Sequence, residues 1–167
     1  SFVEGDVVLL SVVLSFRNEQ EVLDELIKRL RRTLGALDLE HELIFVNDAS
    51  TDGSLELLSK YNHQDNRIKI INMSRQFGCA PCVMAGLRHS KGDAVVYMDS
   101  DLQDPPELIP KLLEKLSEGA EVVHTTRTRR SGEGVFKMWL TRRAYRIINS
   151  VADIDIPENM GDFKLLS

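Results

Sequence analysis

A group of carboxylates directly follows a short apolar segment in the second half of the chain. Ala94–Met98 is apolar, and the next residues read Asp99-Ser-Asp-Leu-Gln-Asp-Pro-Pro-Glu107. Alternate side chains of an extended strand share a side, which places Asp99 and Asp101 together. Carboxylates suit Mg²⁺ or Mn²⁺, and magnesium typically takes one or two of them plus substrate phosphates. The spacing indicates a metal-chelated diphosphate; the plainer alternative is a loop whose aspartates, Asp104 above all, cap the next helix.

Polar residues also follow two other apolar segments. The first reads Val12-Val-Leu-Ser-Phe-Arg-Asn-Glu19, and the second reads Leu43-Ile-Phe-Val-Asn-Asp-Ala-Ser-Thr-Asp-Gly53. Ligands of open α/β sheets bind beyond the carboxyl ends of the strands, so we expect all three polar segments at one sheet edge. For Asn18 and Ser50 we favour turn and cap roles over ligand contact.

The elements that would position these residues alternate between strands and helices. Apolar runs predict strands over 7–16, 42–47, 67–73, 94–99 and 121–126. Helical spacing and helix-start signals predict helices over 19–35, over 52–61, from Pro105 and Pro106 to a stop at Gly119, and over 134–151. Ser50 or Thr51 is available as N-cap of the second helix. This order is typical of an α/β domain with a mostly parallel sheet.

Length and charge exclude several classes of protein. The chain of 167 residues has the length of one domain, and its net charge of −5 argues against a nucleic-acid-binding protein. Seven basic residues and one acidic residue lie between Arg127 and Arg146, which indicates either a local anionic partner or a solvated helix face. Two cysteines, and no apolar run of about 20 residues, favour a cytoplasmic protein without a transmembrane span.

Together the three polar segments resemble family 2 of the GT-A glycosyltransferases, whose corresponding segments read approximately VVxPxYNE, VDDGSTDGT and DxD. Four further stretches look like the polyprenyl-phosphate branch, which includes dolichyl-phosphate mannose synthase and bactoprenol glucosyltransferases: Ser74-Arg-Gln-Phe-Gly78, DLQDPPE, Arg130-Ser-Gly-Glu133 and Gly161-Asp-Phe-Lys-Leu-Leu166. The resemblance covers essentially the whole chain. It implies a GT-A fold with a mostly parallel, Rossmann-like sheet, and a single catalytic domain over 1–167 that is truncated at its C-terminus relative to the family.

The resemblance also implies a nucleotide-sugar donor, UDP-glucose or similar, with UDP- and GDP-sugars both remaining candidates. The residues implied at the nucleoside are Leu14, Phe16, Glu19 and Asp48. The residues implied at the diphosphate and its Mg²⁺ or Mn²⁺ are Asp99, Asp101, Gln103 and Arg75. Within these sets, Glu19 would accept from a ribose hydroxyl, Asp48 would accept from the base, and Asp99 would lie near the ribose or the metal.

By the same resemblance the acceptor is a polyprenyl phosphate of cell-envelope glycosylation. The full-length protein would lie at the cytoplasmic face of the membrane, which it would meet through regions mostly absent from this chain. The cations implied at the acceptor phosphate are Arg127, Arg130, Arg142 and Arg143, with Arg127 favoured. Arg146 and Lys137 would be solvated or face anionic lipid. Transfer would invert the anomeric carbon by direct displacement, and Asp162 could orient the acceptor or take a residual proton.

Two positions depart from the family pattern. Asn47 stands at the first aspartate of VDD, and base recognition is expected to survive because Asp48 is kept. Cys79 stands where a lysine commonly follows the Phe-Gly pair, which removes one possible cation beside the donor.

Two other classes of function stay open. Cys79-Ala-Pro-Cys82 would suit a thioredoxin-like redox protein, because a Cys-x-x-Cys at a helix start can lower the pKa of its first thiol. We favour two small buried hydrophobic residues instead. The other alternative is a nucleotide-binding fragment without catalysis, and no feature of the sequence indicates an oligomeric state.

Overall fold

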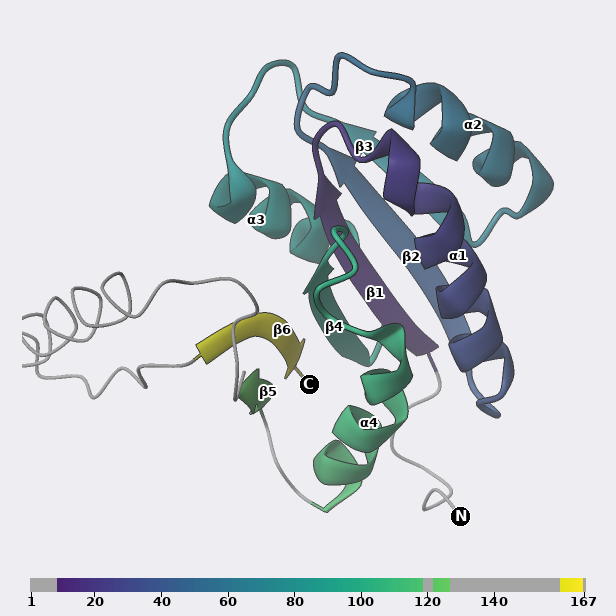
Figure 1. Ribbon diagram of the computed structural model, residues 1–167. Helices are drawn as coiled ribbons and strands as arrows, with labels where there is room; N and C mark the ends of the chain where they lie inside the picture. Colours follow the sequence, from purple (N-terminus) through teal and green to yellow (C-terminus); the bar gives the residue numbers. More distant parts are fainter. Residues whose placement is uncertain (1–8, 119–121, 127–159, 167) are drawn as a thin grey trace, which may run out of the picture. The chain divides into compact units, whose positions relative to one another are not determined.

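The structure is a computed structural model that describes residues 9–118, 122–126 and 160–166. Its elements alternate between strands and helices along the chain (Figure 1). They are β1 (Leu9–Phe16), α1 (Gln20–Gly35), β2 (Glu40–Asn47), α2 (Ser54–Gln64), β3 (Ile68–Asn72), α3 (Cys79–His89), β4 (Ala94–Asp99), the 3-10 helix η1 (Pro106–Leu108), α4 (Ile109–Ser117), β5 (Val122–Thr126) and β6 (Met160–Leu166). The helix expected over 134–151, and the expected stop at Gly119, lie outside the described residues.

The strands form one sheet in the order β3-β2-β1-β4-β6-β5. β1 pairs in parallel with both β2 and β4, and β2 pairs in parallel with β3. β6 runs antiparallel to β4, with Lys164 opposite Tyr97. The four parallel strands are joined through helices, which confirms the α/β class and the mostly parallel sheet expected from the sequence.

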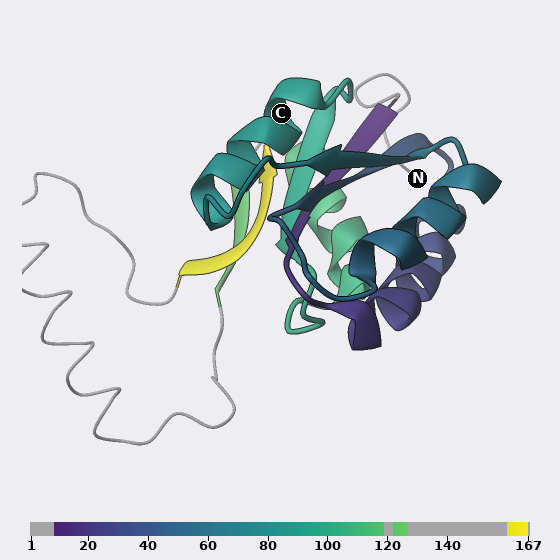
Figure 2. The same cartoon turned by 90° about the horizontal axis from the view of Figure 1, so that it is seen from above.

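Helices cover both faces of the parallel strands (Figures 1 and 2). On one face, Leu10, Val12 and Leu14 of β1 join a core with α1, α2 and α4. On the other face, Val13 packs in a smaller core that includes Cys82 of α3. Because both faces are buried, the middle of each central strand is a continuous apolar run, Val12–Leu14 in β1 and Leu43–Val46 in β2, as is usual for parallel strands.

The two faces hold their helices by different means. The buried residues of α1 recur every three or four positions: Leu23, Leu26, Ile27, Leu30 and Leu34. α3 instead approaches the sheet through a glycine, since a Cβ on Gly86 would lie only 2.2 Å from Cγ1 of Val13. The close approach of α3 therefore depends on the absence of a side chain at Gly86.

Two expected helix caps differ from the structure. The helix α2 begins at Ser54 with Gly53 at its N-cap, so neither Ser50 nor Thr51 caps it. The Asp52 carboxylate accepts the Ser54 amide instead, at 2.9 Å. The cap expected at Asp104 also differs in position, because Pro105 is the N-cap residue of η1 and Asp104, which is buried, lies one residue before it.

The chain divides into two units, Ser1–Val123 with Phe163–Ser167, and His124–Asp162. Of the second unit the structure describes only the strand residues 124–126 and 160–162. Within the described part of the chain, every helix is too short or too polar to cross a bilayer.

Candidate functional site

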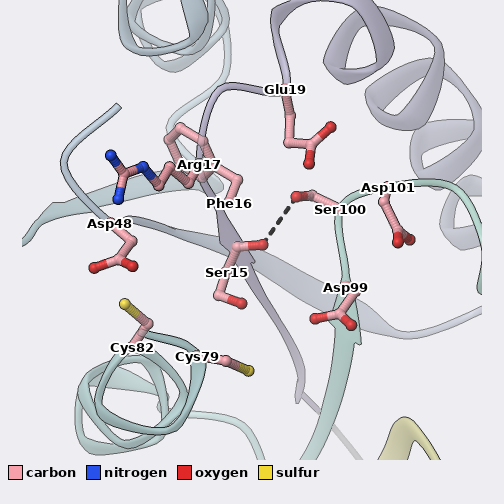
Figure 3. A pocket seen from close by; sticks show the side chains of 10 residues that line it. All are labelled: Ser15, Phe16, Arg17, Glu19, Asp48, Cys79, Cys82, Asp99, Ser100 and Asp101. Carbon is pink, nitrogen blue, oxygen red and sulfur yellow. Dashed lines mark hydrogen bonds between the residues drawn. The ribbon is translucent and has the colours of Figure 1, made fainter. Parts of the chain in front are cut away.

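The carboxyl ends of β1, β2 and β4 border a pocket of about 270 Å³ (Figure 3). The residues that line it are Ser15, Phe16, Arg17, Glu19, Asp48, Cys79, Cys82, Asp99, Ser100 and Asp101. β1 pairs with β2 on one side and with β4 on the other. Open α/β sheets bind ligands at such a point, where the strand order reverses. The topology and the pocket therefore indicate the same site.

Backbone strain is concentrated in the loops that follow these strands. Among the described non-glycine residues, three have a positive φ: Asn18 at 55°, Ala49 at 54° and Leu102 at 61°. One lies after β1, one after β2 and one after β4. A left-handed conformation costs a non-glycine residue of order 1 kcal/mol, and such strain gathers at functional sites.

The loop after β1 is joined to the loop after β2 by side-chain hydrogen bonds. The Asn18 carboxamide oxygen accepts the Thr51 amide at 2.7 Å, and the Asn18 amide donates to the Ser50 hydroxyl at 3.0 Å. The Glu19 amide donates to the Ser54 hydroxyl at 2.9 Å. These bonds confirm the turn roles expected of Asn18 and Ser50, and they fix the backbone that carries Glu19.

Asp48 holds the segment that leads into α3. Its two carboxylate oxygens accept the amides of Phe77 at 2.7 Å and Gly78 at 3.0 Å. Gly78 has φ of +89°, a conformation that favours glycine. The side chain is nearly buried, yet it lines the pocket, and each carboxylate oxygen has a second lone pair for a ligand.

Asn47 has a structural role that explains its departure from the family pattern. Its carboxamide oxygen accepts the Ser50 amide at 2.9 Å, and its NH₂ group donates to the Asn72 side chain at 3.1 Å. An ionised aspartate could make the first bond but has no proton for the second.

The buried side chain of Tyr97 holds the Asp99 carboxylate. The Tyr97 hydroxyl donates to the Asp99 carboxylate at 2.7 Å, and it lies 2.9 Å from the Cys79 sulfur and 3.3 Å from the Ser15 hydroxyl. Burial raises the pKa of the Tyr97 phenol, so the phenol keeps its proton. The Asp99 carboxylate is therefore oriented before any ligand arrives.

Negative charge is crowded around Glu19. Burial raises the pKa of the Glu19 carboxyl, and the neighbouring charges of Asp101, Asp52 and Asp99 raise it further. A cation bound among these carboxylates would relieve this repulsion. Among the described residues, no three His, Cys, Asp or Glu side chains are grouped to hold a metal by themselves. The carboxylates fit the kind of magnesium site that needs substrate oxygens to complete it.

The structure brings five of the predicted site residues to the pocket: Phe16, Glu19, Asp48, Asp99 and Asp101. Three others are not among its lining residues. Leu14 is fully buried in the core, because it alternates in register with Val12. Gln103 is exposed, and its backbone N–H donates to the Asp101 carboxylate at 3.0 Å. The Arg75 guanidinium stacks on the Phe77 ring, 4.8 Å from the ring centroid.

The side chains expected to bind the acceptor lie outside the described residues. These are Arg127, Arg130, Arg142, Arg143, Arg146 and Lys137, whereas Asp162 is described only by its backbone in β6. Sequence reasoning missed five lining residues: Ser15, Arg17, Cys79, Cys82 and Ser100. The signal for Arg17 is its position, since it directly follows a strand whose end was expected at the site.

The cysteine pair agrees only in part with the expectation of two buried residues. Cys82 is buried, as expected, but Cys79 is exposed at the pocket. Burial raises the pKa of the Cys82 thiol to about 11, and the Asp48 carboxylate beside it acts in the same direction. A thiol with a raised pKa is a poor nucleophile at neutral pH.

Comparisons with known proteins place this chain in a family. The family model described as Glycosyl transferase family 2 matches residues 11–167, so the chain belongs to this family. An uncharacterized glycosyltransferase, YkcC of Bacillus subtilis, is 44% identical over 156 residues, which is 93% of this chain and 48% of the relative. The family and fold exclude the thioredoxin-like alternative.

Other relatives have names that state a function. The bactoprenol glucosyl transferase of Shigella phage SfX is 36% identical over 95% of this chain and 52% of the relative. The undecaprenyl-phosphate 4-deoxy-4-formamido-L-arabinose transferase of Edwardsiella ictaluri is 36% identical over 92% of this chain and 46% of the relative. These relatives support the polyprenyl-phosphate branch. The chain spans about half the length of the curated relatives it matches.

Solved structures confirm the GT-A fold. Mannosyl-3-phosphoglycerate synthase from Rubrobacter xylanophilus superposes with a TM-score of 0.72 at 18% identity, over 96% of this chain and 53% of that chain. A mannosyltransferase from Pyrobaculum calidifontis, solved with GDP-Man and Mn²⁺, gives a TM-score of 0.62 at 17% identity, over 98% of this chain and 45% of that chain.

Proposed function

We propose that this chain is the donor-binding part of a glycosyltransferase that moves a sugar from a nucleotide sugar, UDP-glucose or similar, to a polyprenyl phosphate. The observation that carries the proposal is the shared pocket of Asp48, Asp99 and Asp101, which come from the ends of two different strands. Family membership and the bactoprenol and undecaprenyl-phosphate relatives support the same substrates. The full-length protein would act at the cytoplasmic face of a membrane.

Asp99 and Asp101 are the proposed holders of a divalent cation, Mg²⁺ or Mn²⁺. Two hard oxygen donors and a locally crowded negative charge suit such an ion, and the Pyrobaculum neighbour was solved with Mn²⁺. When bound, the ion would act as a Lewis acid on the diphosphate leaving group. Gln103 remains a proposed contact, reached from the exposed end of the same loop.

The remaining pocket residues would bind the nucleoside. Asp48 would accept a hydrogen bond from the base, and Glu19 would accept one from a ribose hydroxyl, beside the Phe16 ring. Arg75 is the proposed diphosphate contact outside the pocket, since a guanidinium matches paired phosphate oxygens.

The chemical step we propose is inverting displacement at the anomeric carbon by the acceptor phosphate. A phosphate monoester is already largely ionised near neutral pH, with a second pKa of about 6, so no strong general base is required. Arg127, Arg130, Arg142 and Arg143 would neutralise this phosphate, and Asp162 would orient it.

Replacing Asp101 tests the proposed donor site. Asp101→Ala is expected to lower the affinity for UDP or GDP in Mn²⁺ by at least about 10-fold, because it removes one of two carboxylates that face the ion. Titration calorimetry with and without Mn²⁺ measures this effect. Asp38→Ala, an exposed aspartate outside the pocket, is the matched control and should bind as the wild type does.

Equal nucleotide binding with and without metal, and in both variants, would contradict the metal role. Nucleotide binding without sugar transfer from any UDP- or GDP-sugar would favour the alternative function, a nucleotide-binding fragment without catalysis. The chain's coverage of only about half of its relatives is the observation behind that alternative.

A further inference from the structure

Arg17 is the one basic residue among the ten that line the pocket. The other charged lining residues are the four carboxylates Glu19, Asp48, Asp99 and Asp101. The Arg17 side chain is partly buried, and among the described residues it makes no ion pair, hydrogen bond or ring contact. Its guanidinium nitrogens are not among the buried polar atoms without a partner, so its N–H donors stay open to a ligand. The arrangement therefore points to an acceptor on a ligand.

The backbone places Arg17 at the Asp48 end of the pocket. Phe16 pairs with Asn47, and the Asp48 amide donates to the Phe16 carbonyl at 3.0 Å, so the ends of β1 and β2 leave the sheet together. Asp99 pairs with Ser15, which lies two residues before Arg17 in the chain. In Figure 3 the Arg17 guanidinium lies on the same side of the pocket as the Asp48 carboxylate, away from Asp99 and Asp101.

Charge separates the two ends of the pocket in the same way. Burial and the neighbouring charges of Asp101, Asp52 and Asp99 raise the pKa of the Glu19 carboxyl. The Asp99 and Asp101 end is negative and suits a cation that carries the diphosphate. The Asp48 end has a hydrogen-bond acceptor and a hydrogen-bond donor together.

We propose that Arg17 is a specificity-determining residue that, with Asp48, reads the edge of the donor's nucleobase. This inference rests on the proposed function, because it needs a nucleotide in the pocket. Uracil and guanine each present a carbonyl oxygen next to a ring N–H. The Asp48 carboxylate can accept only from the N–H, and the Arg17 guanidinium can donate only to the carbonyl. A pair of this kind favours bases with that edge.

Binding of nucleosides and nucleotides to variants of the full chain tests this proposal. Arg17→Gln is expected to lower the affinity for UDP and the affinity for uridine by the same factor, roughly 10-fold. The factor is the same because the lost contact is to the base that both ligands share. GDP and guanosine form the parallel pair for the other base. Arg17→Lys keeps the charge but loses the planar fork, so it should also lose affinity for the nucleoside. Arg88→Gln, at an exposed arginine near the end of α3, is the matched control and should bind as the wild type does.

Three results would overturn the inference. A loss confined to UDP and GDP, with nucleosides unaffected, would place Arg17 on the phosphates. Wild-type affinity of Arg17→Gln for all four ligands would remove it from the site. An equal loss in Arg88→Gln would mean that only long-range attraction is involved. Wild-type protein that binds neither UDP nor GDP would instead overturn the proposed function, and this inference with it.

Discussion

The Tyr97 hydroxyl contacts three polar side chains of the pocket, so its removal is expected to disturb all three. Tyr97→Phe removes the donor to Asp99 and the partner of Cys79 and Ser15. We expect a loss of about 1 kcal/mol in the free energy of unfolding, the usual value of a buried hydrogen bond. We also expect weaker UDP binding in Mn²⁺, because Asp99 is no longer held. Chemical denaturation and calorimetry measure the two effects.

Tyr61→Phe makes the same chemical change away from the pocket. The Tyr61 hydroxyl donates to Asp24 on α1, so this variant should lose stability and keep nucleotide affinity. Equal affinity in both variants would show that Tyr97 supports the fold and not the site.

At the same scale, sequence reasoning located the carboxylates but not all of their neighbours. Asp48, Asp99 and Asp101 were found because they end apolar runs, a property of local sequence. Arg17 and Cys79 were not expected to line the pocket, since the direction of a side chain past a strand end depends on the loop backbone. That backbone includes the positive φ of Asn18, which no periodicity reveals. Leu14 was misplaced although strand alternation with Val12 already points it to the core.

At the scale of elements, the contact between α3 and the sheet depends on Gly86. Gly86→Ala puts a methyl group 2.2 Å from Cγ1 of Val13, a short, buried side chain with little room to move. We expect a loss of about 1–3 kcal/mol in the free energy of unfolding, the usual cost of overpacking. Urea denaturation measures it.

Gly35→Ala is the control for this prediction. A Cβ at Gly35, in the last turn of α1, meets no atom within 4 Å. Alanine has the higher helix propensity, so this variant should be as stable as the wild type or slightly more stable. Similar losses in both variants would argue against close packing of α3 as the cause.

Element positions were predictable because apolar periodicity reports them directly, and Ala94–Asp99 was placed with its observed bounds. The helix caps were not predictable in the same way. Ser50 and Thr51 are good capping residues, but the loop after β1 engages both of them through Asn18. Long-range pairing of this kind overrides local preference, and a single sequence does not display it.

At the scale of the whole molecule, Asp65 links stability to pH. The Arg67 side chain, which donates two hydrogen bonds to it, is the main cause that lowers the pKa of the Asp65 carboxyl to about 2. A lowered pKa means that the carboxylate stabilises the fold above its ordinary pKa of 3.8, and that this contribution is lost as the pH falls toward 2.

Asp65→Asn should therefore cost about 1–2 kcal/mol of unfolding free energy at pH 7, with allowance for the partly exposed partner. The difference from the wild type should shrink as the pH falls from 4 toward 2. Urea titrations at a series of pH values test this. Asp38→Asn, at an exposed aspartate, supplies the baseline, and a difference for Asp65→Asn that does not change with pH would refute the linkage.

The hydrogen bonds that join the loops after β1 and β2 have a thermodynamic consequence for any ligand of the pocket. Asn18, Ser50 and Thr51 hold these loops in one conformation in the free protein. The conformational entropy of these loops is therefore lost when the chain folds and not when a ligand binds. A preorganised rim of this kind lets a small contact area yield useful affinity.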